Sequence, residues 1–428
     1  MRKSFIFLLT IFVCALGAAD APAQSELNAT SNTVVSQPSL NTGGALEGSN
    51  TIALSASEIV SQISEARRLL SSRQTSASRD LVTVAAFDTE TSQTSMFSVP
   101  KNAFLVKDAN LSATADPGGN MRVHVVRANG VNTAVTVTDE STGRSLVPLL
   151  VQFPIVKGGA VSEIAYYTSA HPALLSPALA TAGKTYVRKM LDAAAARLAQ
   201  DGVTVSPDII DIAEHLCIAE HIDHKRFMNE DHTVLFPEIL SLYALNEGNT
   251  FRYSVSTAGA GGMIQMIPQT YNAIREQHSG VSLQSDFVSG MRDHANALEA
   301  MLLYINDTWN NLQQNTEVQN ALRDGIATKP QLLAAGYNSN PGRLAGYLKK
   351  GGAEWRTLIP AETQIYLKIY TAIDTTLQLG ADLGGIDSPS TYAQVAVVIG
   401  RPSGAAAVLS WLNRSLLFSG SFLGRFFH

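Results

Sequence analysis

The side chains of this sequence whose types and spacing could carry chemistry gather between residues 247 and 270. An apolar helix, expected over about residues 236 to 247, ends at Glu247, and the small-residue stretch STAGAGGMIQMIPQT follows. A carboxylate at the end of a buried helix costs free energy unless it has a role, and loss of solvation raises its pKa. A general acid that works near neutral pH needs such a raised pKa. We therefore expect Glu247 to be a catalytic acid.

The stretch that follows Glu247 offers neutral hydrogen bonders and no second acid. No Asp or Glu occurs between Gly248 and Arg275, whereas Ser256 and Gln265 are available. A glycosidase normally uses two carboxylates, except where the N-acetyl group of the substrate is the nucleophile. The glycines would let a sugar ring approach the backbone closely. The alternative is a tight turn without a ligand; the Gly-Lys-Ser/Thr of a phosphate loop is missing.

Three segments of the sequence together resemble a known family. Glu247, Ser256 nine residues later, and GAGGMIQ with Pro268 and Thr270 are similar to the soluble lytic transglycosylase (SLT) domain of peptidoglycan-cleaving enzymes. The segments AGYNSNPG (335–342) and IPAETQIY (359–366) resemble the Ala-Tyr-Asn-Ala-Gly-Pro-Gly and Pro-x-Glu-Thr-x-x-Tyr motifs of that family, in the same order. Gly248, Ile264 and Ser339-Asn340 depart from the pattern, which concerns substrate preference more than the reaction.

The resemblance implies a lysozyme-like α fold, a lyase reaction and no cofactor. Glu247 would protonate the glycosidic oxygen between N-acetylmuramic acid and N-acetylglucosamine while the muramoyl acetamido oxygen stabilises the anomeric carbon. Glu247 would then take the proton of the muramoyl C6 hydroxyl, which closes a 1,6-anhydro ring without water. The resemblance assigns Ser256, Gln265 and Asn338 to holding the sugar. It assigns Tyr337 and Tyr366 to orienting Glu247 by packing and hydrogen bonding.

The sequence is also compatible with two other functions and with one other kind of site. A lysozyme-like hydrolase would differ only in admitting water, and a non-catalytic peptidoglycan-binding scaffold of an envelope assembly would need no acid. Cys217, His221 and His224 share one helical face with a spacing that can bind Zn²⁺. Neither His-Glu-x-x-His nor a second Cys/His pair accompanies them, so an ion-paired helix, for instance Glu220 with His224, is favoured and no metal is expected.

Composition and the first residues indicate the compartment and the partners. The chain has 428 residues and a net charge of −5, without a basic run that would bind nucleic acid. Arg2 and Lys3 precede an apolar run and Ala21-Pro22-Ala23, the pattern of a cleaved signal peptide and a periplasmic or otherwise exported protein. Only Cys217 would then remain, so no internal disulfide can form. The expected partners are peptidoglycan glycan strands and, by analogy alone, an envelope secretion or conjugation complex.

The periodicity of the sequence predicts an α+β multidomain protein, with a small N-terminal antiparallel β domain followed by an all-α lysozyme-like (SLT) domain. Short β-branched runs are expected as strands at 81–87, 102–106, 121–128, 133–139, 145–153 and 162–168. Helical patterns cover 56–72, 176–200 and most of the chain beyond Ser206, including one helix over 286–312. Arg401-Pro402 and Asn413-Arg414 interrupt the apolar C-terminal tail, so neither half of it can span a bilayer, but contact with a membrane stays open. The expected divisions are a signal peptide (1–23), a flexible leader (24–55), a helix plus β domain (56–171), a connecting helix (172–205), the catalytic domain (206–380), and a linker with the apolar tail (381–428).

Overall fold

The N-terminal part of the chain is a strongly curved antiparallel sheet. The computed structural model describes residues 54–72 and 78–377. The seven strands follow the order β2-β1-β6-β5-β4-β3, and β7 pairs with β6. Backbone hydrogen bonds between Met96 and Asp116 join β2 to the chain just after β3, so the two ends of the sheet meet in a near-barrel. The strands are β1 (Leu81–Asp88), β2 (Gln93–Pro100), β3 (Asn110–Thr114), β4 (Asn120–Arg127), β5 (Ala134–Asp139), β6 (Ser145–Lys157) and β7 (Ala160–Tyr167).

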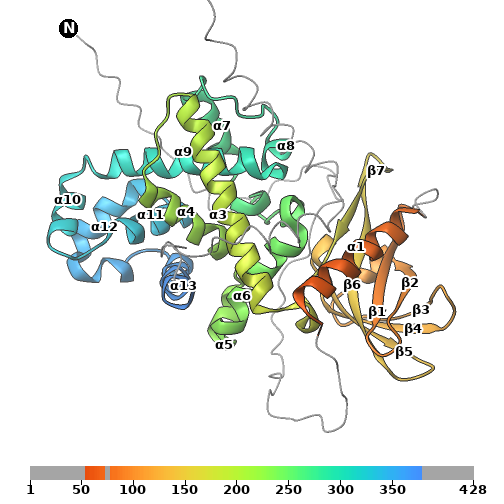
Figure 1. Cartoon of the computed structure of the whole chain (residues 1–428). Coiled ribbons are helices and arrows are strands. Elements are labelled where there is room, and N and C mark those ends of the chain that lie inside the picture. The colour runs from red at the N-terminus through yellow and green to blue at the C-terminus, as the bar shows by residue number, and fades with distance from the viewer. Residues whose placement is uncertain (1–53, 73–77, 378–428) are drawn as a thin grey trace, which may run out of the picture.

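Helix α1 (Ala56–Ser72) covers this sheet and also touches the helical region (Figure 1). Its apolar residues recur at helical spacing, and Ile59, Ile63 and Leu70 are buried in one cluster with β-strand residues such as Leu149. Ala244 and Leu245 of the helical region belong to the same cluster. The N-terminal helix therefore packs against both parts of the protein.

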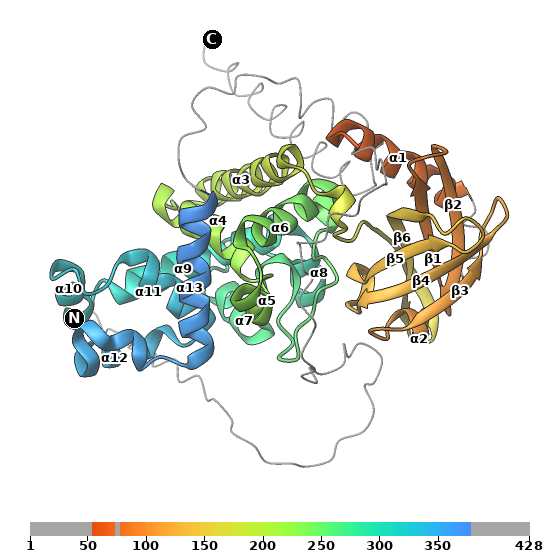
Figure 2. The ribbon, with the colours of Figure 1, turned by 90° about the horizontal axis from the view of Figure 1, so that it is seen from below.

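The C-terminal part is helical, and its long helix α3 (Pro177–Gln200) packs against α4, α6 and α9 along one side of this region (Figures 1 and 2). Ser176 caps α3 by accepting a hydrogen bond from the backbone N–H of Leu179, and Pro177 occupies the first turn. A Cβ atom on Gly183 would overlap the backbone carbonyl of Leu240, so glycine permits the close contact of α3 with α6. The other helices are α4 (Pro207–Ala219), α5 (His224–Asn229), α6 (His232–Asn246), α7 (Pro268–Gln277), α8 (Phe287–Arg292), α9 (His294–Leu312), α10 (Thr316–Arg323), α11 (Lys329–Asn338), α12 (Leu344–Gly351) and α13 (Ala361–Leu377).

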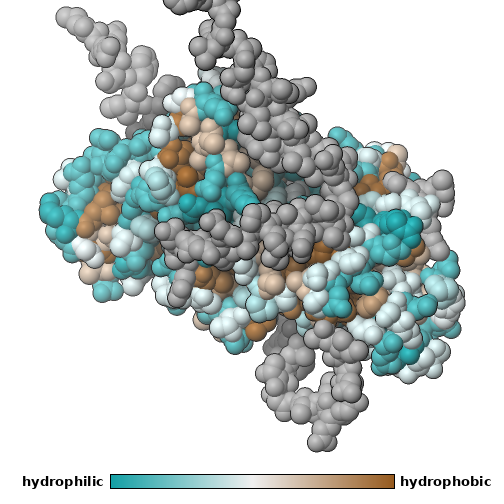
Figure 3. All heavy atoms as spheres, viewed as in Figure 1, coloured by the Kyte–Doolittle hydropathy of each residue, from teal (hydrophilic) through white to brown (hydrophobic). Residues whose placement is uncertain are grey.

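One apolar core runs through both parts of the protein. Its buried residues extend from Val82 in β1 to Ile373 in α13 without a break between sheet and helices. On the face seen in Figure 3, the apolar side chains that remain visible form small patches among polar ones. Among the described residues, no helix is long and apolar enough to cross a membrane.

The predicted order of a β domain followed by a helical region is confirmed, with local differences. The run 102–106, expected as a strand, contributes instead to the short helix α2 (Lys101–Phe104), and the strands β2 and β3 were not predicted. The helix expected over 286–312 is divided into α8 and α9, because Asp293 caps α9 by accepting from Ala295 and Asn296. The signal peptide of residues 1–23 and the tail of residues 381–428 lie outside the described residues.

Candidate active site

Glu247 directly follows the buried helix α6, as the sequence predicts. Its backbone has φ 45° and ψ −124°, a conformation that favours glycine and strains other residues. Burial raises the pKa of the Glu247 carboxyl, and the positive charge of Arg67 on α1 opposes this rise. Among the described residues the carboxylate has no hydrogen-bond partner. The charged group that faces Glu247 thus belongs to the N-terminal helix.

The glycine-rich stretch forms a folded loop against α8. The backbone bridges Val255 to Gly261 and Gly261 to Met266, and the 3₁₀ turn η5 (Gly262–Ile264) follows. A Cβ on Gly262, whose φ is 71°, would overlap the carbonyl of Met291, whereas a Cβ on Gly259 would meet open space. The expectation that these glycines admit a sugar ring is therefore corrected for Gly262, which is required by packing within the chain.

Ser256 and Gln265 both lie on this loop and both bind its backbone. Ser256 is exposed, and its hydroxyl accepts a hydrogen bond of 3.0 Å from the N–H of Ala260. Gln265 is half-buried with φ 47°, and its Nε2 donates to the carbonyl of Gly262 over 2.8 Å. Its amide oxygen and the Ser256 hydroxyl proton remain able to bind a ligand.

Tyr337 and Asn338 form the C-terminal end of α11 beside the loop. The Tyr337 hydroxyl donates a hydrogen bond of 2.7 Å to the carbonyl of Ile264. Oδ1 of Asn338 is buried and has no hydrogen-bond partner among the described residues. A buried acceptor without a partner is costly, so this oxygen is a candidate for binding a donor group of a ligand.

Tyr366 on α13 reaches a carboxylate that the sequence analysis did not select. Its hydroxyl donates a hydrogen bond of 2.6 Å to Oε1 of Glu220, the residue that directly follows α4. The expected role of Tyr337 and Tyr366 in orienting Glu247 by hydrogen bonds is corrected accordingly, because their hydroxyls donate to Ile264 and Glu220. Helices α4, α11 and α13 lie side by side, apart from α1 (Figures 1 and 2).

Glu220 has the electrostatic character of an acid that is protonated at neutral pH. Burial raises its pKa to about 8, the Tyr366 hydrogen bond opposes the rise, and the negative charge of Glu362 adds to it. Tyr337 lies within electrostatic range of the same carboxyl. As a whole residue, Glu220 is half-buried. The sequence signal for Glu220 was the same as for Glu247, a glutamate at the end of an apolar helix.

The expectation that Cys217, His221 and His224 share one helical face is wrong, because α4 ends before His221 and α5 begins at His224. The thiol of Cys217 is buried against the sulfur of Met301, and burial raises its pKa. Nε2 of His221 lies 2.8 Å from the carbonyl oxygen of Met263, and its ring stacks on Phe251. Within residues 54–72 and 78–377, no group of three or more His, Cys, Asp or Glu side chains could hold a metal ion.

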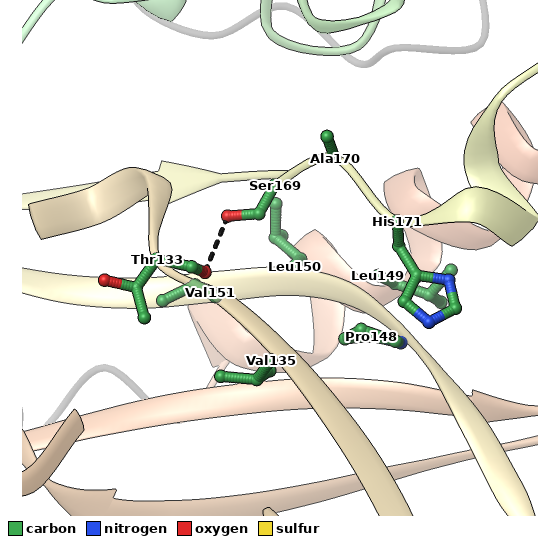
Figure 4. A pocket seen from close by; sticks show the side chains of 9 residues that line it. All are labelled: Thr133, Val135, Pro148, Leu149, Leu150, Val151, Ser169, Ala170 and His171. Carbon is green, nitrogen blue, oxygen red and sulfur yellow. Dashed lines mark hydrogen bonds between the residues drawn. The ribbon is translucent and has the colours of Figure 1, made fainter. Parts of the chain in front are cut away.

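A separate shallow pocket lies in the β domain (Figure 4). Its lining is largely apolar, and the Ser169 hydroxyl at its rim donates to the Thr133 carbonyl over 2.9 Å. Burial lowers the pKa of His171, which also lines it. None of the candidate site residues contributes to this pocket, which lies between the sheet and the segment 169–171 that follows β7.

No protein-family model, curated protein or solved structure matches the chain. The candidate site is therefore defined by its own geometry: Glu220 from α4, the loop that carries Gln265, and the tyrosines of α11 and α13.

Proposed function

We propose that this chain is a peptidoglycan lytic transglycosylase with a lysozyme-like catalytic region, and that Glu220 is its single catalytic acid. The observation that carries the proposal is the hydrogen bond from Tyr366 to Glu220. Tyr366 belongs to the third of the three segments that resemble the SLT family. Tyr337, from the second segment, binds the first segment through Ile264 and lies in electrostatic range of Glu220. These contacts among the three segments support Glu220 as the acid.

The chemistry follows from the state of that carboxyl. Because the pKa of Glu220 is about 8, the group is largely protonated at neutral pH and can give its proton to the glycosidic oxygen. The substrate's acetamido oxygen then stabilises the anomeric carbon, and the resulting carboxylate accepts the proton of the C6 hydroxyl as the 1,6-anhydro ring closes. No water is consumed. Gln265 and Asn338 would hold the sugar through the amide oxygens described above.

Glu247 is the second candidate for the acid. Its strained backbone and its unpartnered, desolvated carboxyl are features of functional positions. Its spacing of nine residues to Ser256 matches the family pattern. The positive charge of Arg67 opposes the rise of the Glu247 pKa, and neither Tyr337 nor Tyr366 donates a hydrogen bond to Glu247. Both observations favour Glu220 as the acid.

A lysozyme-like hydrolase is the second candidate function. Glu362 lies within electrostatic range of Glu220 and is exposed, so a second carboxylate is available near the acid. Glycosidases that use water normally need such a pair. The two functions differ in the mass of the product, because the anhydro product lacks one water.

The test is digestion of purified peptidoglycan sacculi by the full chain, with the soluble products weighed. Anhydro products that disappear in Glu220→Gln and persist in Glu247→Gln support the proposal. Loss of activity in Glu247→Gln alone would move the acid to Glu247, and hydrated products would establish the hydrolase. Binding of sacculi without any cleavage would leave the scaffold function, in which an envelope secretion or conjugation complex is the partner. Export to the periplasm is part of the proposal, since the substrate is found there.

A further inference from the structure

His221 connects the proposed acid to the glycine-rich loop. It follows Glu220 directly at the end of α4, and its Nε2 lies 2.8 Å from the carbonyl oxygen of Met263 in η5. A carbonyl oxygen can only accept, so Nε2 must carry the proton. Burial lowers the pKa of His221 to about 3, which keeps the ring neutral near physiological pH. The imidazole is therefore a fixed donor to the loop.

The same ring also holds the segment that leads into the loop. It stacks on Phe251 with 3.4 Å between ring centroids and 6° between ring planes. Phe251 has a φ of 55°, an uncommon value for a bulky residue. The surrounding contacts must maintain this conformation. His221 thus contacts the chain on both sides of the turn at Gly259.

Two side chains near Glu220 bind two successive backbone carbonyls of η5. His221 binds the carbonyl of Met263, and Tyr337 binds that of Ile264. Gln265 is the next residue and donates back to Gly262, so its position depends on the same turn. We infer that His221 is a positioning residue that fixes Gln265 relative to Glu220. This inference rests on the proposed function for its effect on catalysis, and on geometry alone for its effect on the loop.

The test compares two substitutions of His221 in the full chain. His221→Gln keeps an N–H donor near the position of Nε2, whereas His221→Phe keeps an aromatic ring for stacking on Phe251 and loses the donor. We expect His221→Phe to increase amide hydrogen exchange at least tenfold in residues 262–266 and to lower kcat on sacculi at least tenfold, with KM within about twofold. His221→Gln should restore both values to within about threefold of the wild type.

His232 provides a matched control. It stacks on Phe227 with 4.2 Å between centroids, and its Nε2 lies 2.8 Å from the Phe227 carbonyl oxygen, at the junction of α5 and α6. His232→Phe should lower stability comparably without changing exchange in residues 262–266 or kcat.

Three outcomes decide the inference. Unchanged loop exchange in His221→Phe would overturn it, and so would equal loop exchange in the His221 and His232 variants. Increased loop exchange with unchanged kcat in an active enzyme would overturn the catalytic part. If the wild type cleaves no sacculi, the proposed function fails, and the exchange data still decide whether His221 positions the loop.

Discussion

Oε1 of Glu220 accepts a hydrogen bond of 2.6 Å from the hydroxyl of Tyr366, which joins the end of α4 to the middle of α13. Hydrogen bonding to a carboxylate favours its charged form, whereas burial disfavours it. The two effects oppose each other at Glu220, and burial dominates, so the pKa remains at about 8. This balance can be altered by removing a single hydroxyl.

Tyr366→Phe should therefore raise the pKa of Glu220 above about 8. The decline of activity on the alkaline side reports that pKa and should move to higher pH, as measured by the pH profile of sacculus cleavage. Tyr370→Phe, on the same helix but stacked on His215, should leave the profile unchanged. An unshifted pH profile in Tyr366→Phe would show that the alkaline decline of activity reports the titration of another group.

Glu220 should also make the stability of the protein depend on pH. Its pKa of about 8 in the folded state exceeds the ordinary glutamate value of about 4.3, so the folded state binds the proton more tightly. This contribution to stability is complete below about pH 4 and is lost as the pH rises through about 8. We expect the free energy of unfolding, measured with denaturant at pH 5 and pH 8, to fall less in Glu220→Gln than in the wild type. An identical fall in both proteins would contradict the raised pKa.

Gly262→Ala should destabilise the protein more than Gly259→Ala. Both residues have positive φ, which costs a non-glycine residue about 1 kcal/mol. At Gly262 the added Cβ also overlaps the carbonyl of Met291, whereas at Gly259 it meets nothing. We expect a loss of about 1 kcal/mol at Gly259 and of about 2–4 kcal/mol at Gly262. Equal losses in denaturant titrations would argue against close contact of the loop with α8.

Glu247→Gly should stabilise the protein, because φ 45° with ψ −124° suits glycine and because a desolvated carboxyl is removed. The gain should be about 1 kcal/mol. With Glu220 as the acid, the variant should retain cleavage of sacculi to within about threefold. A stabilised but inactive Glu247→Gly would instead identify Glu247 as the acid, since strain and function would then coincide at that position.

The sequence pattern was sufficient to predict those helices and strands whose signal lies in their own residues. The helical pattern over residues 176–200 predicted α3, and short β-branched runs predicted β1 and β4 to β7. β2 (QTSMFSVP) was missed because its apolar residues are few and polar ones interrupt them. It is a strand because it pairs with β1 along its whole length. Such pairing depends on tertiary contacts and leaves only a weak trace in the sequence.

The candidate site, too, could be predicted from the sequence only in part. Glu247 was selected by its place at the end of an apolar helix and by its spacing to Ser256. The tyrosine that binds Glu220, by contrast, lies far from it in the sequence. Tyr366 is 146 residues from Glu220, and only the packing of α13 on α4 brings them together. The desolvation predicted for Glu247 is present at that residue, and the tyrosines are elsewhere. Within the described residues, Glu220 and Glu247 both follow an apolar helix, so this feature of the sequence does not by itself choose between them.

The continuous core from Val82 to Ile373 determines how this protein can be shortened. A fragment that begins at Ser176 would leave the apolar side chains that now meet the sheet open to water, and such a surface promotes aggregation. Biochemical preparations should therefore retain the sheet together with α1, and heating should melt both parts in one cooperative transition.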